Sequence, residues 1–245
     1  RAPKSNPTNR GAEYWLSRTH ELLHVPSRLA SMKRILASET LTVSVLVLLF
    51  AGDFFRNLLT VPGWVALALA SAGWAIATLI AERVSWKSIP LPVLPVFGWI
   101  ALSPLWSPYA LSSVGLTLAF FCTVLIGVAL VSVNTVDELV THASTALRAI
   151  LASSLVFEIV VGLRGVPLYP VGMDAPPGTS IELAWCRAIF FESGGRIQGI
   201  VGNANLLGML ALLALVIAVV RIAARETRTW AIVDAVLAGI LLVKT

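Results

Sequence analysis

Long stretches without a charged side chain constrain the fold of this chain more than any other feature. Residues 57–81, 88–136 and 197–220 contain no Asp, Glu, Lys or Arg. A helix needs about 20 apolar residues to cross the hydrocarbon core of a bilayer. Each stretch is therefore long enough for one crossing, and the second is long enough for two. Only helices and closed barrels satisfy their backbone hydrogen bonds inside a bilayer, and runs of this length predict helices.

The composition indicates the same class. Hydrophobic residues make up 57% of the 245 residues and charged residues 13%, with a mean hydropathy of +0.85. A typical soluble domain carries about 25% charged residues. The sequence therefore predicts an all-α, polytopic transmembrane helical bundle.

Seven spans are expected in this bundle, with boundaries set by the apolar runs. They cover residues 35–51, 62–82, 88–104, 110–133, 147–163, 203–221 and 229–244. The third contains four prolines, which predict a helix that is bent or partly unwound at its start. We expect residues 35–245 to be the N-terminal part of the transmembrane domain of a larger protein.

The distribution of basic residues predicts a cytoplasmic N-terminus, because Lys and Arg are enriched in cytoplasmic loops. With that orientation, thirteen basic residues fall on the inner side, among them Arg148 and the three arginines at 221–228. Only four fall on the outer side. This bias predicts that the connection 164–202, the longest in the chain, lies outside.

Residues 1–34 are basic, and leucine and aromatic residues are interspersed among their charges. We expect this segment to be an amphipathic helix on the anionic headgroups of the inner leaflet. The net charge of +5 then requires no nucleic-acid partner. Of the two cysteines, Cys122 lies in an apolar span and Cys186 in a polar connection. Their different depths predict that both are free thiols.

Three of the four outer basic residues lie in the loop 164–202, where the positive-inside bias predicts few. They are Arg164, Arg187 and Arg196. Guanidinium groups offer a planar fork of donors that suits phosphate oxygens. Glycines at 194, 195, 199 and 202 let the backbone approach a ligand closely, and Asn203 is placed to cap the following helix, whose N-terminus favours anions. The loop predicts a site for a phosphate or diphosphate headgroup. The alternative is that the arginines contact lipid phosphates and the glycines only turn the chain.

The stretch "GGRIQGIVGNANLLG", residues 194–208, resembles the signature of the O-antigen ligase and O-antigen polymerase family. In that signature an arginine and a glycine three residues on precede an Asn-x-Asn that opens a helix; here these are Arg196, Gly199, Asn203 and Asn205. Most members have proline where this chain has Ala204. A second stretch, "LSPLWSPYALSS", resembles the family's Trp-Ser pattern with Trp106 and Ser107, although Pro108 replaces the usual acidic residue.

The resemblance implies a GT-C-like glycosyltransferase of the bacterial plasma membrane that needs neither metal nor cofactor. Such enzymes transfer a glycan from an undecaprenyl-diphosphate carrier to an acceptor hydroxyl on the outer face. Arg196 corresponds to an arginine that binds the carrier diphosphate, with Gly199, Asn203 and Asn205 beside it, whereas Arg187 and Arg164 are added from their position alone. Whether the chain is a ligase or a polymerase stays open.

The catalytic base is unknown at this point. All three histidines lie on the predicted inner side, and the resemblance implies a histidine in a later outer loop, beyond residue 245. Within the loop 164–202 the carboxylates are Asp174, Glu182 and Glu192. Glu192 is the candidate for a direct role, and an ion pair that orients Arg196 is the simpler interpretation.

Two other functions remain open. "HELLH", residues 20–24, satisfies H-E-x-x-H, which on a helix places two zinc-binding imidazoles on one face. However, it is flanked by charges and followed by Pro26. A transporter, or a scaffold for an anionic lipid-linked substrate, would need ionisable groups within the membrane. Glu158, near the outer end of the fifth span, is the residue for that role, and pairing with Arg164 is the alternative.

Overall fold

The computed structural model describes residues 36, 38–85, 91–176, 178–192, 194–225 and 228–245. Within them the chain is helical, with one isolated bridge, Leu168 to Cys186, and no strand. The α-helices are α3 (Glu39–Phe50), α4 (Gly52–Ala81), α5 (Val93–Leu102), α6 (Ala110–Val133), α7 (Val136–Arg164), α8 (Ala204–Ala223) and α9 (Arg228–Lys244). The all-α prediction is confirmed. The basic segment 1–34 lies outside the described residues.

Four of these helices are long and apolar enough to cross a membrane, namely α4, α6, α7 and α8. Each of the other three predicted spans contains a shorter helix. These are α3 with 12 residues, α5 with 10 residues and α9 with 17. The chain thus has the helices of a membrane protein, and seven crossings remain a prediction.

A sharp elbow joins α3 to α4. Ala51 leaves the helical region at φ −121° and ψ 36°, and α4 starts at Gly52, ten residues before the predicted second span. α4 is itself kinked at Thr60, which has φ 62° and ψ 176°. Pro62 explains the kink, because its ring clashes with the carbonyl four residues earlier and disfavours helix at the preceding residue.

The α5–α6 hairpin is apolar and open to its surroundings. α5 continues into a 3-10 turn, η2 (Ser103–Trp106), and has no buried residue. Phe97 of α5 lies edge-on to Phe120 and Phe121 of α6, with ring centroids 6.0 and 5.7 Å apart. The predicted unwinding at the start of the third span falls partly on residues 86–90, outside the described residues.

α7 starts eleven residues before the predicted fifth span. Thr135 and Glu138 form a capping box: the Thr135 side chain accepts from the Glu138 N–H, and the Glu138 side chain accepts from the Thr135 N–H. Arg148, which is the second residue of the predicted fifth span, therefore lies well inside α7. It makes a bidentate ion pair with the buried Asp234 of α9, with Nη2 to Oδ2 at 2.8 Å.

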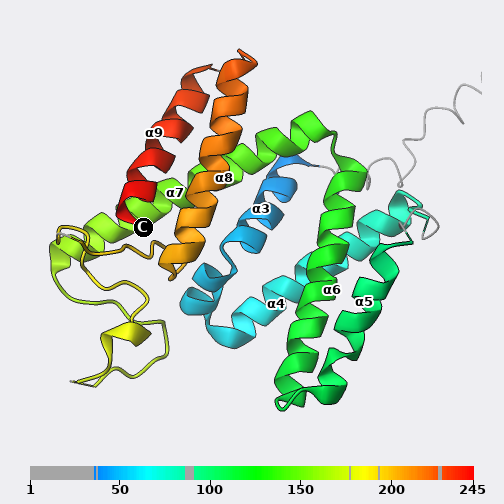
Figure 1. Ribbon diagram of the computed structural model, residues 1–245, viewed down its shortest axis with the longest axis horizontal. Helices are drawn as coiled ribbons and strands as arrows, with labels where there is room; N and C mark the ends of the chain where they lie inside the picture. Colours follow the sequence, from blue (N-terminus) through cyan, green and yellow to red (C-terminus); the bar gives the residue numbers. More distant parts are fainter. Residues whose placement is uncertain (1–35, 37, 86–90, 177, 193, 226–227) are drawn as a thin grey trace, which may run out of the picture.

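The helices alternate in direction, so that several of their ends gather at one end of the bundle (Figure 1). We call this the loop end, because the connection 165–203 covers it. Here the Val171 N–H donates to the Asn57 carbonyl at the start of α4. The Ile197 N–H donates to the Lys244 carbonyl at the end of α9. The loop is thus tied to both halves of the bundle.

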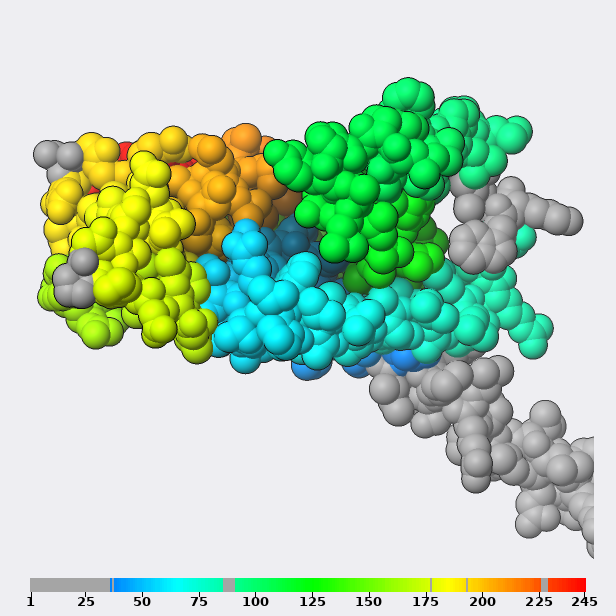
Figure 2. Space-filling view, turned by 90° about the horizontal axis from the view of Figure 1, so that it is seen from below, coloured from blue at the N-terminus to red at the C-terminus, as the bar shows by residue number. Residues whose placement is uncertain are grey.

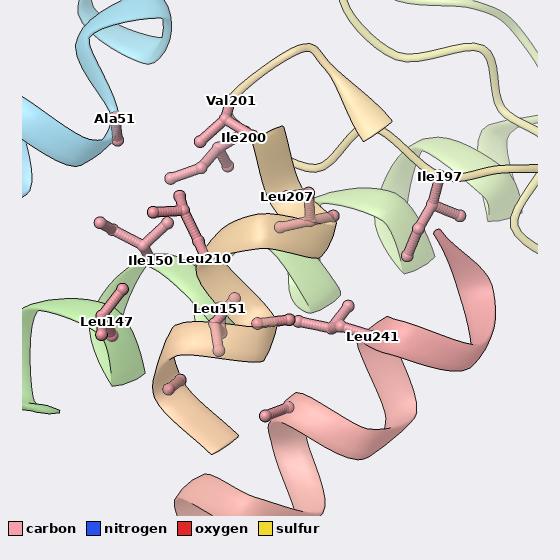
Figure 3. Packing of buried hydrophobic residues seen from close by; sticks show 13 residues of the cluster. Ala51, Leu147, Ile150, Leu151, Ile197, Ile200, Val201, Leu207, Leu210 and Leu241 are labelled. Atoms are coloured by element: carbon pink, nitrogen blue, oxygen red, sulfur yellow. The ribbon is translucent and has the colours of Figure 1, made fainter. Parts of the chain in front are cut away.

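Two buried apolar clusters hold the helices together. One joins α3, α4, α6 and α7. The other joins α7, α8 and α9, and includes three residues of the loop, Ile197, Ile200 and Val201. Figure 3 shows Ile197 beside the end of α9, and Ile200 and Val201 on the side of Ile150 and Leu210. The signature stretch is therefore part of the core.

Candidate functional site

The loop at 165–203 has a defined path with little regular structure. Leu168 and Cys186 exchange two backbone hydrogen bonds of 2.9 and 3.0 Å, which close residues 169–185 into one lobe. The segment 181–193 forms only a 3-10 turn, η3 (Ile181–Leu183), within its described residues. Outside this turn, Cys186 pairs with Leu168, and the Glu192 N–H donates to the Ile189 carbonyl.

Trp185 fastens the lobe to the helices. Its ring lies between Phe54 of α4 and Phe157 of α7, with centroids 5.9 and 4.9 Å away. Its indole N–H donates to the Ile200 carbonyl at 2.8 Å. A buried tryptophan satisfied in this way contributes a large apolar area and one directional bond, so the lobe is held over the ends of α4 and α7.

Glu158 of α7 is the main anchor of the signature stretch. It is 1% exposed. Oε1 accepts from the N–H groups of Gln198 and Gly199 at 2.8 and 2.7 Å, and Oε2 accepts from the Cys186 thiol at 3.3 Å. All three partners are donors, so both carboxylate oxygens have their hydrogen bonds within the loop. Pairing with Arg164, the alternative considered from sequence, is not formed, and Glu158 holds loop backbone.

Two glycines of the signature fit against helices. Gly199 has φ +61°, and a Cβ there would lie 2.7 Å from the Ser154 side chain of α7. Gly202 has φ +65°, and a Cβ there would lie 3.1 Å from the Asn57 amide. Both positions need glycine because of a left-handed backbone and a close neighbour. Gly199 is buried, so the backbone at this glycine approaches α7 closely, and not a ligand.

Arg196 lies at the surface of the loop end, between two helix ends. Its Nε donates to the main-chain oxygen of Thr245 after α9, and its Nη2 donates to Asn205 Oδ1 of α8 at 2.8 Å. A guanidinium carries five N–H donors. The Nη1 group makes no hydrogen bond to any described residue, and the side chain is exposed. Arg196 is thus held in place with donors left for a ligand.

The two asparagines of the signature have different roles. Asn203 is the N-cap of α8, as predicted, and its side chain accepts from the Leu206 N–H at 3.1 Å. Asn205, exposed on the first turn, holds Arg196. The motif therefore places a fixed cation beside the N-terminus of a 20-residue helix, and both features attract anions.

Among the described residues, the other two loop arginines are not joined to Arg196 by a hydrogen bond or a shared partner. Arg164 is exposed at the last residue of α7. Arg187 is half-buried, and its Nε is buried without a hydrogen-bond partner among the described residues. Of the three arginines expected to form the site, only Arg196 is held by contacts within the signature stretch.

The loop carboxylates stay apart from Arg196. Asp174, Glu182 and Glu192 are exposed, and none of them makes an ion pair within the described residues. The expected Glu192–Arg196 pair is not formed, because an amide oxygen and a main-chain oxygen orient the arginine instead.

The Trp-Ser pattern lies elsewhere. Ser107 lies in the turn before α6, where its hydroxyl accepts from the Tyr109 N–H at 3.1 Å and from the Ser113 hydroxyl at 2.6 Å. Trp106 stacks on Trp99 with centroids 5.0 Å apart. The turn between α5 and α6 is separated from the loop 165–203 along the long axis of the molecule (Figure 1). The two motifs therefore do not form one site in this part of the chain.

Sequence reasoning missed a cleft at the elbow. Figure 2, which looks onto the loop end, shows the surface hollowed between α8 and α6, with α3 deep inside. On the α8 side of this hollow is a cleft of about 270 Å³, which we call the elbow cleft. It is lined by Leu49, Phe50, Gly52, Asp53, Trp64, Leu206, Met209 and Leu210. The sequence signal for a polar group at this position was Asp53, which follows directly after the first apolar run.

Both cysteines are free thiols, as predicted. Cys186 is buried, and burial raises the pKa of its thiol to about 12. At neutral pH it is therefore a donor to Glu158 and not a nucleophile.

The histidines of "HELLH" lie outside the described residues. In the part of the chain that the structure describes, no group of three or more His, Cys, Asp and Glu side chains could hold a metal ion. Comparison with protein-family models, with curated proteins and with solved structures gave no match. The resemblance to O-antigen ligases accordingly rests on the residues quoted above.

Proposed function

We propose that this chain is a membrane glycosyltransferase of the O-antigen ligase or polymerase type. It takes a glycan from an undecaprenyl-diphosphate carrier and transfers it to an acceptor hydroxyl. The loop end faces the outside of a bacterial plasma membrane, and the N-terminus is cytoplasmic. This orientation accords with the distribution of basic residues along the sequence, of which four fall in the predicted outer segments and thirteen in the predicted inner ones.

The geometry of Arg196 is the observation that carries the proposal. Asn205 and the end of α9 hold its guanidinium at the N-terminus of α8, with the Nη1 donors unengaged among the described residues. Oxygens of a diphosphate suit a planar, permanently charged group. A helix N-terminus adds backbone donors and a favourable dipole. Arg187 and Arg164 would extend the same positive surface, and Gly199 and Asn203 fix the backbone that carries it.

The chemistry requires such a site. As the acceptor oxygen attacks the anomeric carbon, the bond from that carbon to the phosphate oxygen breaks and the diphosphate leaves with the electron pair. Negative charge therefore grows on the leaving group, and a fixed cation stabilises the transition state more than the ground state. The acceptor proton goes to a base, which we expect beyond residue 245, with Glu192 the weaker candidate within the loop.

The test is glycan transfer from the carrier in proteoliposomes with Arg196→Ala. We expect at least about a 100-fold loss of transfer, the usual effect of removing one preorganised donor, with normal expression and insertion. Arg196→Lys should recover part of the rate, because it restores the charge without the planar fork.

Arg83→Ala is the matched control, since Arg83 is an exposed arginine just after the far end of α4. It should leave transfer unchanged. Full activity of Arg196→Ala would overturn the proposal. So would labelling of an introduced cysteine at the exposed Asp174 from the cytoplasmic side only.

A further inference from the structure

We propose that the elbow cleft binds a neutral, hydroxylated sugar ring, with Asp53 and Trp64 as its polar contacts. The inference rests on the proposed function and assigns a place to the acceptor glycan. Asp53 and Trp64 lie outside both stretches that resemble O-antigen ligases.

The elbow cleft is formed by the packing of three helices. The elbow at Ala51 brings the last turn of α3 and the first turn of α4 together against the first turns of α8. Gly52 lies close to Trp64, since a Cβ there would be 3.4 Å from Trp64 Nε1, an ordinary van der Waals contact. The resulting space of about 270 Å³ is close to the lower end of the range for small-molecule pockets, about 300 Å³.

The polar groups of the cleft suit hydroxyls. Asp53 Oδ1 is 3.2 Å from Arg56 Nη2, and the Asp53 side chain is 39% exposed. Its Oδ2 has no hydrogen-bond partner among the described residues. The Trp64 indole N–H is likewise without an acceptor in the described part of the chain. One strong acceptor and one donor-only group beside apolar walls match a ring that carries both hydroxyls and C–H faces.

Charge excludes two other occupants. For an anion such as the carrier diphosphate, Arg196 is the better place, because the Arg56 guanidinium beside the cleft is already paired with Asp53. A hydrocarbon chain would bury the carboxylate and the indole N–H without giving either a partner, which is unfavourable. The Asp53–Arg56 pair has no net charge. A neutral ligand with several hydroxyl groups can donate a hydrogen bond to the Asp53 carboxylate without adding a charge to the cleft.

The cleft lies beside the proposed diphosphate site. Asn205, which holds Arg196, is followed on α8 by Leu206 and Met209, which line the cleft. The two sites therefore share the first turns of α8. A glycan held in the cleft would direct a hydroxyl toward a donor bound at Arg196.

The test is binding to the full chain in lipid nanodiscs, followed by tryptophan fluorescence. The probes are maltose, N,N′-diacetylchitobiose and sodium diphosphate, each alone; maltoside detergents are avoided because their headgroups have the same chemistry as the probes. Asp53→Asn should weaken binding of the disaccharides by at least about tenfold and leave diphosphate binding unchanged. Trp64→Phe should abolish the fluorescence response to the disaccharides, and Glu182→Gln, at an exposed loop carboxylate, is the control.

The outcomes separate this inference from the proposed function. Disaccharide binding that depends on Asp53, together with diphosphate binding that depends on Arg196, supports both. Disaccharide binding that is equal in Asp53→Asn, or absent while diphosphate still binds through Arg196, overturns the sugar site and leaves the proposed function standing. Failure of both probes to bind the wild-type chain overturns both proposals.

Discussion

The α7–α9 region with its loop and the α5–α6 hairpin are built by different forces. In the first, buried polar groups connect elements: Glu158 binds the loop backbone, and Arg148 pairs with Asp234 across two helices. In the second, the contacts are apolar and α5 buries no residue. Of the two stretches that resemble O-antigen ligases, the arginine stretch lies in the first region and the Trp-Ser stretch in the second.

The contrast shows which contacts fix the relative positions of helices and loops in a membrane protein. Lipid chains are as apolar as leucine, so apolar contact between helices discriminates weakly among arrangements inside a bilayer. A buried hydrogen bond or ion pair does discriminate, because its loss leaves an unsatisfied group in a low-dielectric interior. The region around Glu158 is therefore the one able to hold a reactive geometry, and Arg196 belongs to it.

Among the polar connections, Glu158→Ala is expected to have the largest effect on stability. It leaves the N–H groups of Gln198 and Gly199 buried without an acceptor, at about 1–3 kcal/mol for each. The free energy of unfolding, measured by denaturation with SDS in bicelles, should fall by roughly 2–5 kcal/mol. Glu158→Gln keeps an acceptor oxygen and should lose less. Glu182→Ala, at an exposed carboxylate of the same loop, is the control; if it equalled Glu158→Ala, the anchor would not exist.

The helices could be predicted from the sequence because apolar runs were long. Each of the seven predicted spans contains a helix, and the largest errors lie where a helix continues past the apolar run. α7 extends back to Val136 through three charged or histidine residues, Asp137, Glu138 and His142, and "TVDE" at 135–138 was its readable capping signal. The Arg148–Asp234 pair could not be predicted, because it depends on which helices are neighbours.

In the candidate site, only contacts between residues close in sequence could be predicted. The Asn203 cap depends on a residue and the helix that follows, and it is confirmed. Contacts between distant segments were not predictable: Arg196 meets the end of α9, and Glu158 meets the loop 40 residues later. The same reason hid the elbow cleft, whose walls come from three helices.

Asp234→Ala tests the second polar connection. It leaves Arg148 in α7 without its bidentate partner, and Ser144, which donates to Asp234 at 2.7 Å, also loses its acceptor. Breaking one partner of a buried pair costs about 3–5 kcal/mol. The Arg148 side chain is 21% exposed, so we expect about 2–4 kcal/mol in the same denaturation experiment.

The Arg148→Leu/Asp234→Leu double variant should recover most of the stability that Asp234→Ala loses, because no charge is then left unpaired. A double variant that is as unstable as the sum of the singles would show that the pair is not a connection between α7 and α9.

Gly199→Ala tests the close approach of the loop to α7. The added Cβ meets Ser154 at 2.7 Å on a backbone with φ +61°, and strain of this kind costs about 1–3 kcal/mol. Glycan transfer should fall as well, since the shift of the loop moves Arg196. Gly98→Ala in α5, where nothing lies within 4 Å of the added Cβ, is the matched control and should change neither quantity.

The smallest effect on stability is expected from replacing a leucine of the α5–α6 hairpin, compared with a leucine of the α7–α9 region. Leu116 of α6 is 72% exposed, whereas Leu207 of α8 is fully buried in the cluster that includes the loop. Leu207→Ala leaves a cavity and should cost about 2–5 kcal/mol. Leu116→Ala leaves a space that lipid chains fill, and the free energy of unfolding should change by less than about 0.5 kcal/mol. An equal loss from both leucines would mean that Leu116 packs against protein, and the hairpin would then be as constrained as α7–α9.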